Sequence, residues 1–407
     1  MRISTSTIFD TGVYGMQQQT TTINHTQQQL SSGSRILTPA DDPIAAARAL
    51  EVGQADSINT QYGVNQNSAT SRLSLNESIL GSVTTLIQNV QSQAVNSGNA
   101  TLSNSDRATL AAQVSGVYQQ LLGLANSTDG NGVYLFSGAM GTTQPFQNTV
   151  AGVQYNGDQG SQMVQIGSSR QIQVSLSGAD VFQNIKTGNG SFVTQAAISN
   201  GGSAMINAGV VTNQANWSAS SKNFTIQFSV SGSASTYNVI DNSTNTTVLS
   251  AQPYTSGSAI SLGTSGASVT INGIPANGDT FTVQPSANES VFTTINNLIT
   301  ALQTPINNTA GNAALTNSLN TASQNLSNDL NNILTIRAAN GARINELTTA
   351  KSTSGNLGLQ YKSTLSQLQD VDYTQAISQL NQATVALQAA QKSFVQTSNL
   401  SLFTYMP

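Results

Sequence analysis

Side chains that could support catalysis or bind a metal are few in this sequence and lie far apart. The chain has one histidine, His25, and no cysteine, which excludes a thiol nucleophile, a thiolate metal site and a disulfide. A lone histidine cannot form a catalytic dyad or a histidine-based metal centre, so we expect His25 to lie on the surface. No Gly-x-Ser-x-Gly, phosphate-binding loop or His-Glu-x-x-His motif occurs. The sequence predicts no catalytic residue, no cofactor, no metal site and no enzyme.

Two further groups of polar residues each have two interpretations, one functional and one purely structural. Asp129-Gly130-Asn131-Gly132 resembles part of a calcium loop, but the remaining ligands of such a loop are absent, which favours a turn. Arg337, Arg343 and Glu346 stand out in a chain with only 7% charged residues. They form either a solvated face or interlocking charges within a helical bundle or with a neighbouring molecule.

The composition limits the classes of partner. Net charge is −4 and the basic residues are scattered, which argues against binding of nucleic acid. No apolar run approaches the roughly 20 residues that a membrane helix needs, so we expect no membrane insertion. The first ten residues, MRISTSTIFD, lack a basic region followed by an apolar core, and we expect no cleaved signal peptide. A polar but weakly charged surface suits a subunit that is packed among neighbours.

The elements that organise the chain are its two ends. In each end, residues recur at alternating spacings of four and three, which predicts a narrow stripe along a helix, as in a coiled coil. We call these stripes the terminal seam and expect them to pair with each other. Its N-terminal members are Phe9, Val13, Met16, Thr20, Ile23, Gln27 and Leu30. Its C-terminal members are Tyr373, Ile377, Leu380, Thr384, Leu387, Gln391, Phe394 and Ser398. We expect the apolar members to be the assembly site.

The pattern between the ends predicts a mainly α fold with β structure in three domains. Residues 1–40 with 370–407 form a terminal coiled-coil domain. Residues 41–186 with 286–369 form a long helical bundle with a β-hairpin region. In that region we expect a strand over 133–138 and a hairpin turn at Asn156-Gly157.

Residues 187–285 are predicted to be an inserted all-β domain. Short strands alternate with clusters of Gly, Ser and Asn, as in a small sandwich or barrel. Trp217 is the single tryptophan, and we expect it to be buried in the core of this domain rather than to stack on a carbohydrate. The strands are expected at 223–230, 236–240, 246–249, 268–271 and 280–284.

Several motifs resemble the flagellin superfamily. LSSGSRI at 30–36, followed by Asp41-Asp42 and an alanine-rich helix, is similar to the N-terminal signature of the superfamily. IRAANGARINEL at 336–347 resembles its returning helix. YLFSG at 134–138 and GADVF at 178–182 are more similar to the hook-associated protein 3 family. Asn89 and Gln91 stand where filament flagellins usually have paired arginines.

The resemblance implies a structural adaptor of the bacterial flagellum that joins the hook-associated protein 1 ring to the flagellin filament. It further implies assembly with itself as a ring, export through the flagellar type III apparatus, an export chaperone on the C-terminal helix and an extracellular location at the hook–filament junction. A filament flagellin and a secreted adhesin that binds glycans through residues 187–285 remain as alternatives.

Overall fold

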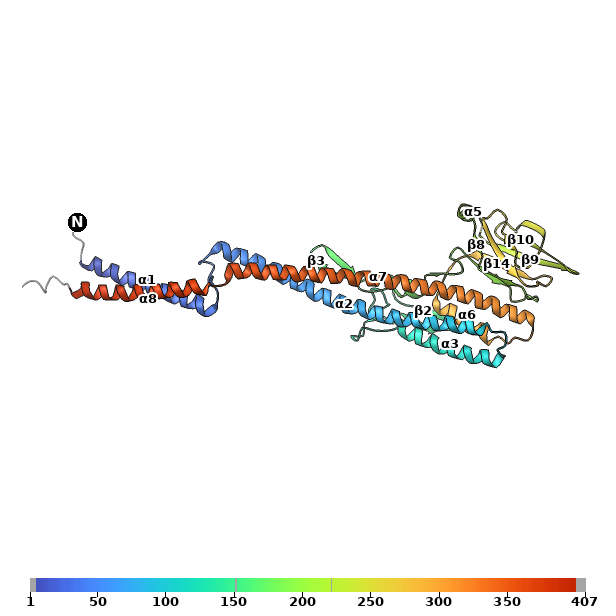
Figure 1. Ribbon diagram of the computed structural model, residues 1–407, viewed down its shortest axis with the longest axis horizontal. Helices are drawn as coiled ribbons and strands as arrows, with labels where there is room; N and C mark the ends of the chain where they lie inside the picture. Colours follow the sequence, from blue (N-terminus) through green and yellow to red (C-terminus); the bar gives the residue numbers. More distant parts are fainter. Residues whose placement is uncertain (1–4, 151, 221, 400–407) are drawn as a thin grey trace, which may run out of the picture. The chain divides into compact units, whose positions relative to one another are not determined.

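The computed structural model describes residues 5–150, 152–220 and 222–399 and divides the chain into two compact units (Figure 1). Unit 1 combines residues up to Gln66 with those from Thr349 onward, and unit 2 comprises Asn67–Thr348. Two long helices, α2 (Pro43–Ser97) and α7 (Thr309–Gln369), contribute residues to both units. The expected mainly α fold with long terminal helices and a β-rich insertion is confirmed. The domain boundaries expected from the sequence remain predictions.

Unit 1 contains four helical segments. Helix α1 (Thr5–Ser32) and helix α8 (Tyr373–Asn399) come from the two ends of the chain and lie side by side (Figure 1). The other two segments are the first part of α2 and the last part of α7. The Asn59 amide donates to the Ser354 carbonyl at 2.8 Å, and the Gln66 amide donates to the Ser354 hydroxyl at 2.9 Å. The α2–α7 contact in this unit therefore includes side-chain amides as well as apolar groups.

The helical part of unit 2 packs the remaining parts of α2 and α7 with α3 (Asn104–Ala125) and α6 (Val291–Gln303). Helix α3 begins in a capping box, in which Asp106 N donates to the Ser103 hydroxyl and Ser103 N donates to the Asp106 carboxylate. A helix break before residue 309 follows from Pro305, which cannot continue a helix. The core includes a cluster of aromatic rings in edge-on and tilted contacts: Tyr118, Phe136, Phe146, Phe182 and Phe292.

The β-hairpin region differs in two details from the sequence prediction. It contains β1 (Phe146–Thr149), β2 (Gly152–Tyr155), β3 (Met163–Gly167), β4 (Arg170–Gln173) and a short helix, α4 (Gly178–Phe182). The strand predicted over 133–138 is wrong, because this segment makes only isolated bridges, Tyr134 with Thr128 and Ser137 with Ser177.

The hairpin turn predicted at Asn156-Gly157 is also wrong. The turn of the β1–β2 hairpin lies between Thr149 and Gly152, which face each other in the register. Asn156 N instead donates to the Pro145 carbonyl at 2.8 Å, and the Tyr155 hydroxyl donates to the Phe136 carbonyl at 3.0 Å. Tertiary contacts of Tyr155 and its neighbours therefore overrode the local turn signal.

The insertion contains two antiparallel sheets. One has the order β11-β10-β9-β14-β6 and the other has the order β12-β13-β7, with β8 also paired to β13. The five strands that the sequence predicted correspond to β9 (Phe224–Ser231), β10 (Ala234–Asp241), β11 (Thr246–Pro253), β13 (Ala267–Asn272) and β14 (Thr280–Pro285). The elements not predicted are β6 (Phe192–Ala196), β7 (Met205–Ile206), β8 (Val210–Val211), α5 (Gln214–Ala219) and β12 (Ala259–Ser261).

The insertion has a hydrophobic core separate from that of the helices. Trp217 is 2% exposed, and its ring lies 5.0 Å from that of Phe192, so the expected core position is confirmed. Strands β5 (Ile185–Lys186) and β15 (Asn288–Glu289) pair where the chain enters and leaves the insertion.

Asparagine side chains of α7 bind backbone groups of the insertion. The Asn317 side chain accepts from Ile206 N at 2.9 Å and donates to the Ala204 carbonyl at 3.2 Å. Asn325 and Asn328 make similar contacts, in which Asn325 accepts from Gly188 N and Asn328 donates to the Gly188 carbonyl. These bonds satisfy buried backbone groups that would otherwise be costly to desolvate.

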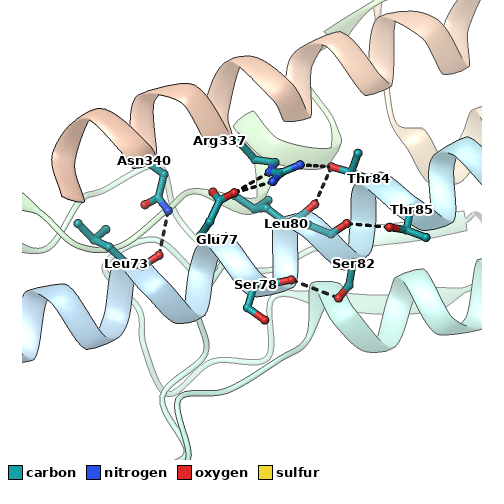
Figure 2. A network of polar contacts seen from close by, with 10 residues as sticks. Leu73, Glu77, Ser78, Leu80, Ser82, Thr84, Thr85, Arg337 and Asn340 are labelled. Carbon is teal, nitrogen blue, oxygen red and sulfur yellow. Dashed lines mark hydrogen bonds and ion pairs between the residues drawn. The ribbon is translucent and has the colours of Figure 1, made fainter. Parts of the chain in front are cut away.

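The arginines of α7 make interlocking contacts within unit 2 rather than a purely solvated face. Arg337 donates from Nε and Nη2 to Glu77 Oε1 of α2 at 2.8 and 2.7 Å, and from Nη1 to the Thr84 hydroxyl (Figure 2). Arg343 donates to the Gln173 side chain at 2.9 Å. Glu346 accepts from Arg170 of β4 at 2.7 Å.

Replacing Arg337 with glutamine is expected to destabilise unit 2 more than the matched change at Arg170. The Arg337 and Glu77 side chains are 30% and 32% exposed, whereas Arg170 is 67% exposed. We expect a loss of about 1–3 kcal/mol for R337Q, as for hydrogen bonds to charged groups, and about 0–1 kcal/mol for R170Q, as for surface pairs. Urea unfolding followed by circular dichroism measures both. Equal losses for the two variants would contradict this ranking.

The insertion is expected to fold without the helices. Its core is its own, and its two ends meet, with Thr187 N donating to the Ala287 carbonyl at 3.0 Å. A fragment of residues 185–289 should therefore unfold cooperatively, with Trp217 fluorescence reporting the transition. Deletion of the same residues with a short linker should leave the helical circular dichroism of the rest intact. A fragment without a cooperative transition would show that the domain needs α7.

Candidate functional site

The pairing of the two chain ends is the candidate functional site, and its helices run antiparallel. Phe9 near the start of α1 contacts Phe394 near the end of α8, with ring centroids 5.5 Å apart and planes at 82°. At the other end of the pair, Val371 N donates to the Gly33 carbonyl at 3.0 Å. A segment after α1 is therefore held beside the segment that precedes α8.

The contact surface of each helix follows a seven-residue repeat with a large and a small position. In α8, Ala376, Ala383 and Ala390 occupy the small position, and the first two are 4% and 7% exposed. Leu380, Leu387 and Phe394 occupy the large position and are partly buried. In α1 the large members are Phe9, Met16, Ile23 and Leu30, and the others are Gly12, Gln19 and Thr26. Small residues let two helices approach closely, and the large residues then fill the space beside them.

The terminal seam and this contact surface have the same seven-residue period. Every second predicted seam member, however, lies one residue away from the residue that is in the contact surface. Phe9, Met16, Ile23, Leu30, Leu380, Leu387 and Phe394 are partly buried. Val13, Tyr373 and Ile377 are 40%, 54% and 48% exposed and point largely to solvent. Gly12 and Ala376 are turned inward in place of Val13 and Ile377.

The displacement has a physical cause. A search for apolar stripes selects large side chains, whereas a close helix pair needs small ones at every second contact. The signal that could have found them is the recurrence of alanine every seven residues in α8. Whether any of these residues contacts another molecule during assembly remains a proposal.

Gly12 marks the closest approach of the two helices. A Cβ atom at Gly12 would lie 2.8 Å from Phe394 Cδ2, closer than side-chain atoms pack. Gly15, one turn further along α1, has nothing within 4 Å of the same position. The Phe394 ring therefore lies over Gly12, and a methyl group at this position would force the ring or the helix to shift.

Arg35 links the segment after α1 to the C-terminal end of α7. Its backbone N donates to the Gln369 carbonyl at 2.6 Å, and its Nη2 donates to the Leu368 carbonyl at 2.9 Å. Its Nη1 forms an ion pair with Asp42 Oδ2 at 3.2 Å. A cation is favourable at a helix C-terminus and an anion is favourable at a helix N-terminus. Asp42 Oδ1 also accepts from Ala45 N in the first turn of α2, and this bond, followed by Arg35, lowers the pKa of Asp42.

His25 has a partner that the sequence analysis did not identify. Its Nε2 lies 3.1 Å from Asp41 Oδ1, and the two side chains are 41% and 22% exposed. Asp41 Oδ2 accepts from Leu37 N and Thr38 N at 2.9 and 2.8 Å. The bond from Thr38 and the contact with His25 lower the pKa of Asp41, so the carboxylate stays ionised below its ordinary range. His25 thus joins α1 to the turn before α2.

Unit 1 also leaves many large apolar side chains about 40% or more exposed within the described residues. They lie on all four of its helical segments: Val13, Tyr14, Ile44, Leu50, Ile58, Val64, Leu357, Leu359, Tyr373, Ile377, Val385 and Val395. Such surface favours contact with other protein molecules. Within the described ranges, no three acidic or histidine side chains are grouped in a way that could hold a metal ion. None of the described helices has an apolar stretch long enough to cross a bilayer.

Comparison with known proteins identifies the family. Residues 3–140 match the bacterial flagellin N-terminal helical region. The flagellar hook-associated protein 3 of Salmonella typhimurium is 30% identical over 408 residues, which cover 99% of this chain and 99% of that protein.

Solved structures agree with the sequence match. The crystal structure of flagellar hook-associated protein 3 from Legionella pneumophila is 30% identical, with a TM-score of 0.74 over 78% of this chain and 98% of that chain. The flagellar junction protein FlgL of the same organism is 29% identical, with a TM-score of 0.71 over 79% of this chain and 100% of that chain. The chain therefore belongs to the flagellar hook-associated protein 3 family, a structural family of the flagellin superfamily.

Proposed function

We propose that this protein is the structural adaptor between the hook-associated protein 1 ring and the flagellin filament of the bacterial flagellum. The observation that carries the proposal is the pairing of the two chain ends in α1 and α8, with apolar side chains left on the outside of unit 1. In the assembled junction this pair forms the inner tube, and copies of the chain stack as a ring. The protein acts through contacts alone and has no enzymatic role.

The exposed apolar surface of unit 1 is the proposed contact with neighbouring molecules. Burial of one Val, Leu or Ile side chain contributes about 1.5–3 kcal/mol. Several such residues per subunit would therefore offset the entropy lost on association. The low charge of the chain, 7% of its residues, leaves little electrostatic repulsion between copies. Val13, Tyr373 and Ile377, which face away from the α1–α8 contact, are the seam residues proposed to touch neighbours.

Family membership also supports a proposal about partners before assembly. We assign to this chain export through the flagellar type III apparatus and an export chaperone that covers α8 beforehand. The polar residues in the α1–α8 contact surface support this assignment, because Gln19 and Thr26 of α1 bury little apolar area against α8. Isolated helices of this kind are marginal in water, so they are readily unfolded for transport. The final location is extracellular, at the hook–filament junction.

Deletion of the gene is expected to leave hooks without filaments and to release flagellin into the medium. Electron microscopy and immunoblotting of the medium measure the two results. A strain that loses its filament because no flagellin is made would instead identify the protein as a filament flagellin. The wild-type gene supplied on a plasmid is the control and should restore filaments.

A pair of glycine substitutions tests the α1–α8 contact in this role. Ala is a better helix former than Gly by about 1 kcal/mol, so G15A should stabilise α1 and preserve motility. G12A places a methyl group against Phe394 and should separate the helices at that point. We expect G12A to reduce the recovery of filaments in the deletion strain at least several-fold, with both variants secreted equally. Normal filaments in the G12A strain would show that the contact is dispensable for assembly.

A further inference from the structure

The two strands that connect the insertion to the helices form a narrow neck. We define the neck as residues 185–189 and 286–289. Glu289 of β15 lies opposite Ile185 of β5, and Asn288 lies opposite Lys186. Any movement of the insertion relative to the helices must bend or open this pair of strands.

Helix α7 holds both strands of the neck. Asn328 donates to the carbonyls of Lys186 and Gly188 at 2.8 and 2.7 Å. Asn325 accepts from Gly188 N at 2.9 Å and donates to Glu289 Oε1 at 3.2 Å. The same Glu289 oxygen accepts from the Thr294 hydroxyl of α6 at 2.8 Å. Glu289 therefore connects the exit strand of the neck to both α6 and α7.

Asp329 is buried beside these contacts and has no hydrogen-bonding role in them. It follows Asn328 directly, lies one turn beyond Asn325 and is 2% exposed. Its Oδ2 is buried and has no hydrogen-bond partner among the described residues. An ionised carboxylate in such a place is costly, because no described donor replaces the water that Oδ2 has lost.

The charges around Asp329 add to this cost. Glu289 is half-buried and, with Thr294 and Asn325, lines an open cavity of about 250 Å³, where its carboxylate is partly solvated. Lys186 of β5 and Asp180 of α4 are exposed, and α6 carries no ionisable residue. The Glu77–Arg337 pair lies two turns further along α7 and is mutually neutralised. Burial raises the pKa of Asp329 well above its ordinary value, and the charge of Glu289 raises it further.

We propose that Asp329 and Glu289 form a pH-dependent switch at the neck, in which protonated Asp329 keeps the neck bound to α7 and ionised Asp329 loosens it. Asn317 continues to hold β7 of the insertion, so the change is confined to the neck. Below the pH at which Asp329 ionises, the neck is closed and the buried carboxyl is neutral. Above it, Asp329 is ionised in its buried position, where the charge of Glu289 opposes it. Opening of the neck then relieves both the desolvation of Asp329 and its repulsion by Glu289.

The direction of the effect follows from linkage. In the open state Asp329 is solvated and titrates near its ordinary pKa of 3.8. Because the closed state holds its proton to higher pH, the closed state loses stability as pH rises between the two pKa values. The opening constant should rise about tenfold per pH unit in this window and become constant above the raised pKa.

Hydrogen–deuterium exchange of the full-length protein tests the switch. Exchange is followed by mass spectrometry from about pH 4 to about pH 8, corrected for the intrinsic rate with an unstructured peptide, so that the tenfold-per-unit slope is visible. We expect protection of the neck to fall with pH, while strand β9 in the core of the insertion keeps its protection. A flat profile at the neck, or a parallel change in β9, would overturn the proposal.

Two variants and a control identify the groups responsible. D329N keeps the size of the side chain but cannot ionise, and it should remove the pH dependence and keep the neck protected at neutral pH. E289Q removes the repulsion while keeping an oxygen for Thr294 and Asn325. It should lower the pKa of Asp329 in the closed state, so the opening constant should stop rising at a lower pH than in the wild type. D180N, at an exposed aspartate of α4, should leave the wild-type profile unchanged. A wild-type slope in D329N would overturn the assignment, and if D329N does not fold, an unshifted profile in E289Q would do so.

Discussion

The rest of the structure depends on the close packing of α1 against α8, which is tightest where Phe394 lies over Gly12. The two ends of one chain must lie against each other along the length of α1 and α8. Neither helix has enough apolar residues to be stable alone, and each uses small residues to approach the other closely. Every element between the ends must therefore be built as a path that leaves through α2 and returns through α7. The contacts of Arg35 with Leu368 and Gln369 close that path where α1 gives way to α2 and α7 gives way to α8.

A second feature follows from the scarcity of charge. With few ion pairs available, the elements of unit 2 are joined by amide side chains that bind backbone groups. Asn340 donates to the Leu73 carbonyl at 2.9 Å, and Asn332 donates to the carbonyls of Asp180 and Val181 (Figure 2 shows the first of these). The ion pair of Glu77 and Arg337 joins α2 to α7. This pair is one of the few places where charged side chains join two elements of unit 2.

Much of this architecture could be predicted from the sequence because it depends on periodicity. The start of helix α3 is visible in the sequence, because Ser103 and Asp106 have the residue types and the spacing of a capping box. The five longest strands of the insertion were expected from alternating apolar residues and from turn residues. The seven-residue repeat of the terminal seam recurs in the α1–α8 contact surface, with alternate members one residue away.

What could not be predicted depends on tertiary contacts. Segment 133–138 has the composition of a strand, but its backbone groups bond to Ser127, Gly141 and Leu176 in different parts of the fold. A search for apolar side chains cannot detect the inward position of Gly12, because glycine has no side chain and the Phe394 ring takes that space. The partner of His25 lies in a turn whose shape is set by Asp41 itself. Asp329 was not noticed, since a single aspartate in a helical pattern gives no sign that it is buried.

The asparagines of α7 have a consequence for how this protein can change over evolution. Asn317, Asn325 and Asn328 recognise the main chain of the insertion, and a main-chain carbonyl or N–H is the same whatever side chain it carries. Substitutions across the outer surface of the insertion can therefore accumulate without loss of its attachment to α7. This attachment therefore constrains the three asparagines of α7 more than it constrains the side chains of the insertion that they hold.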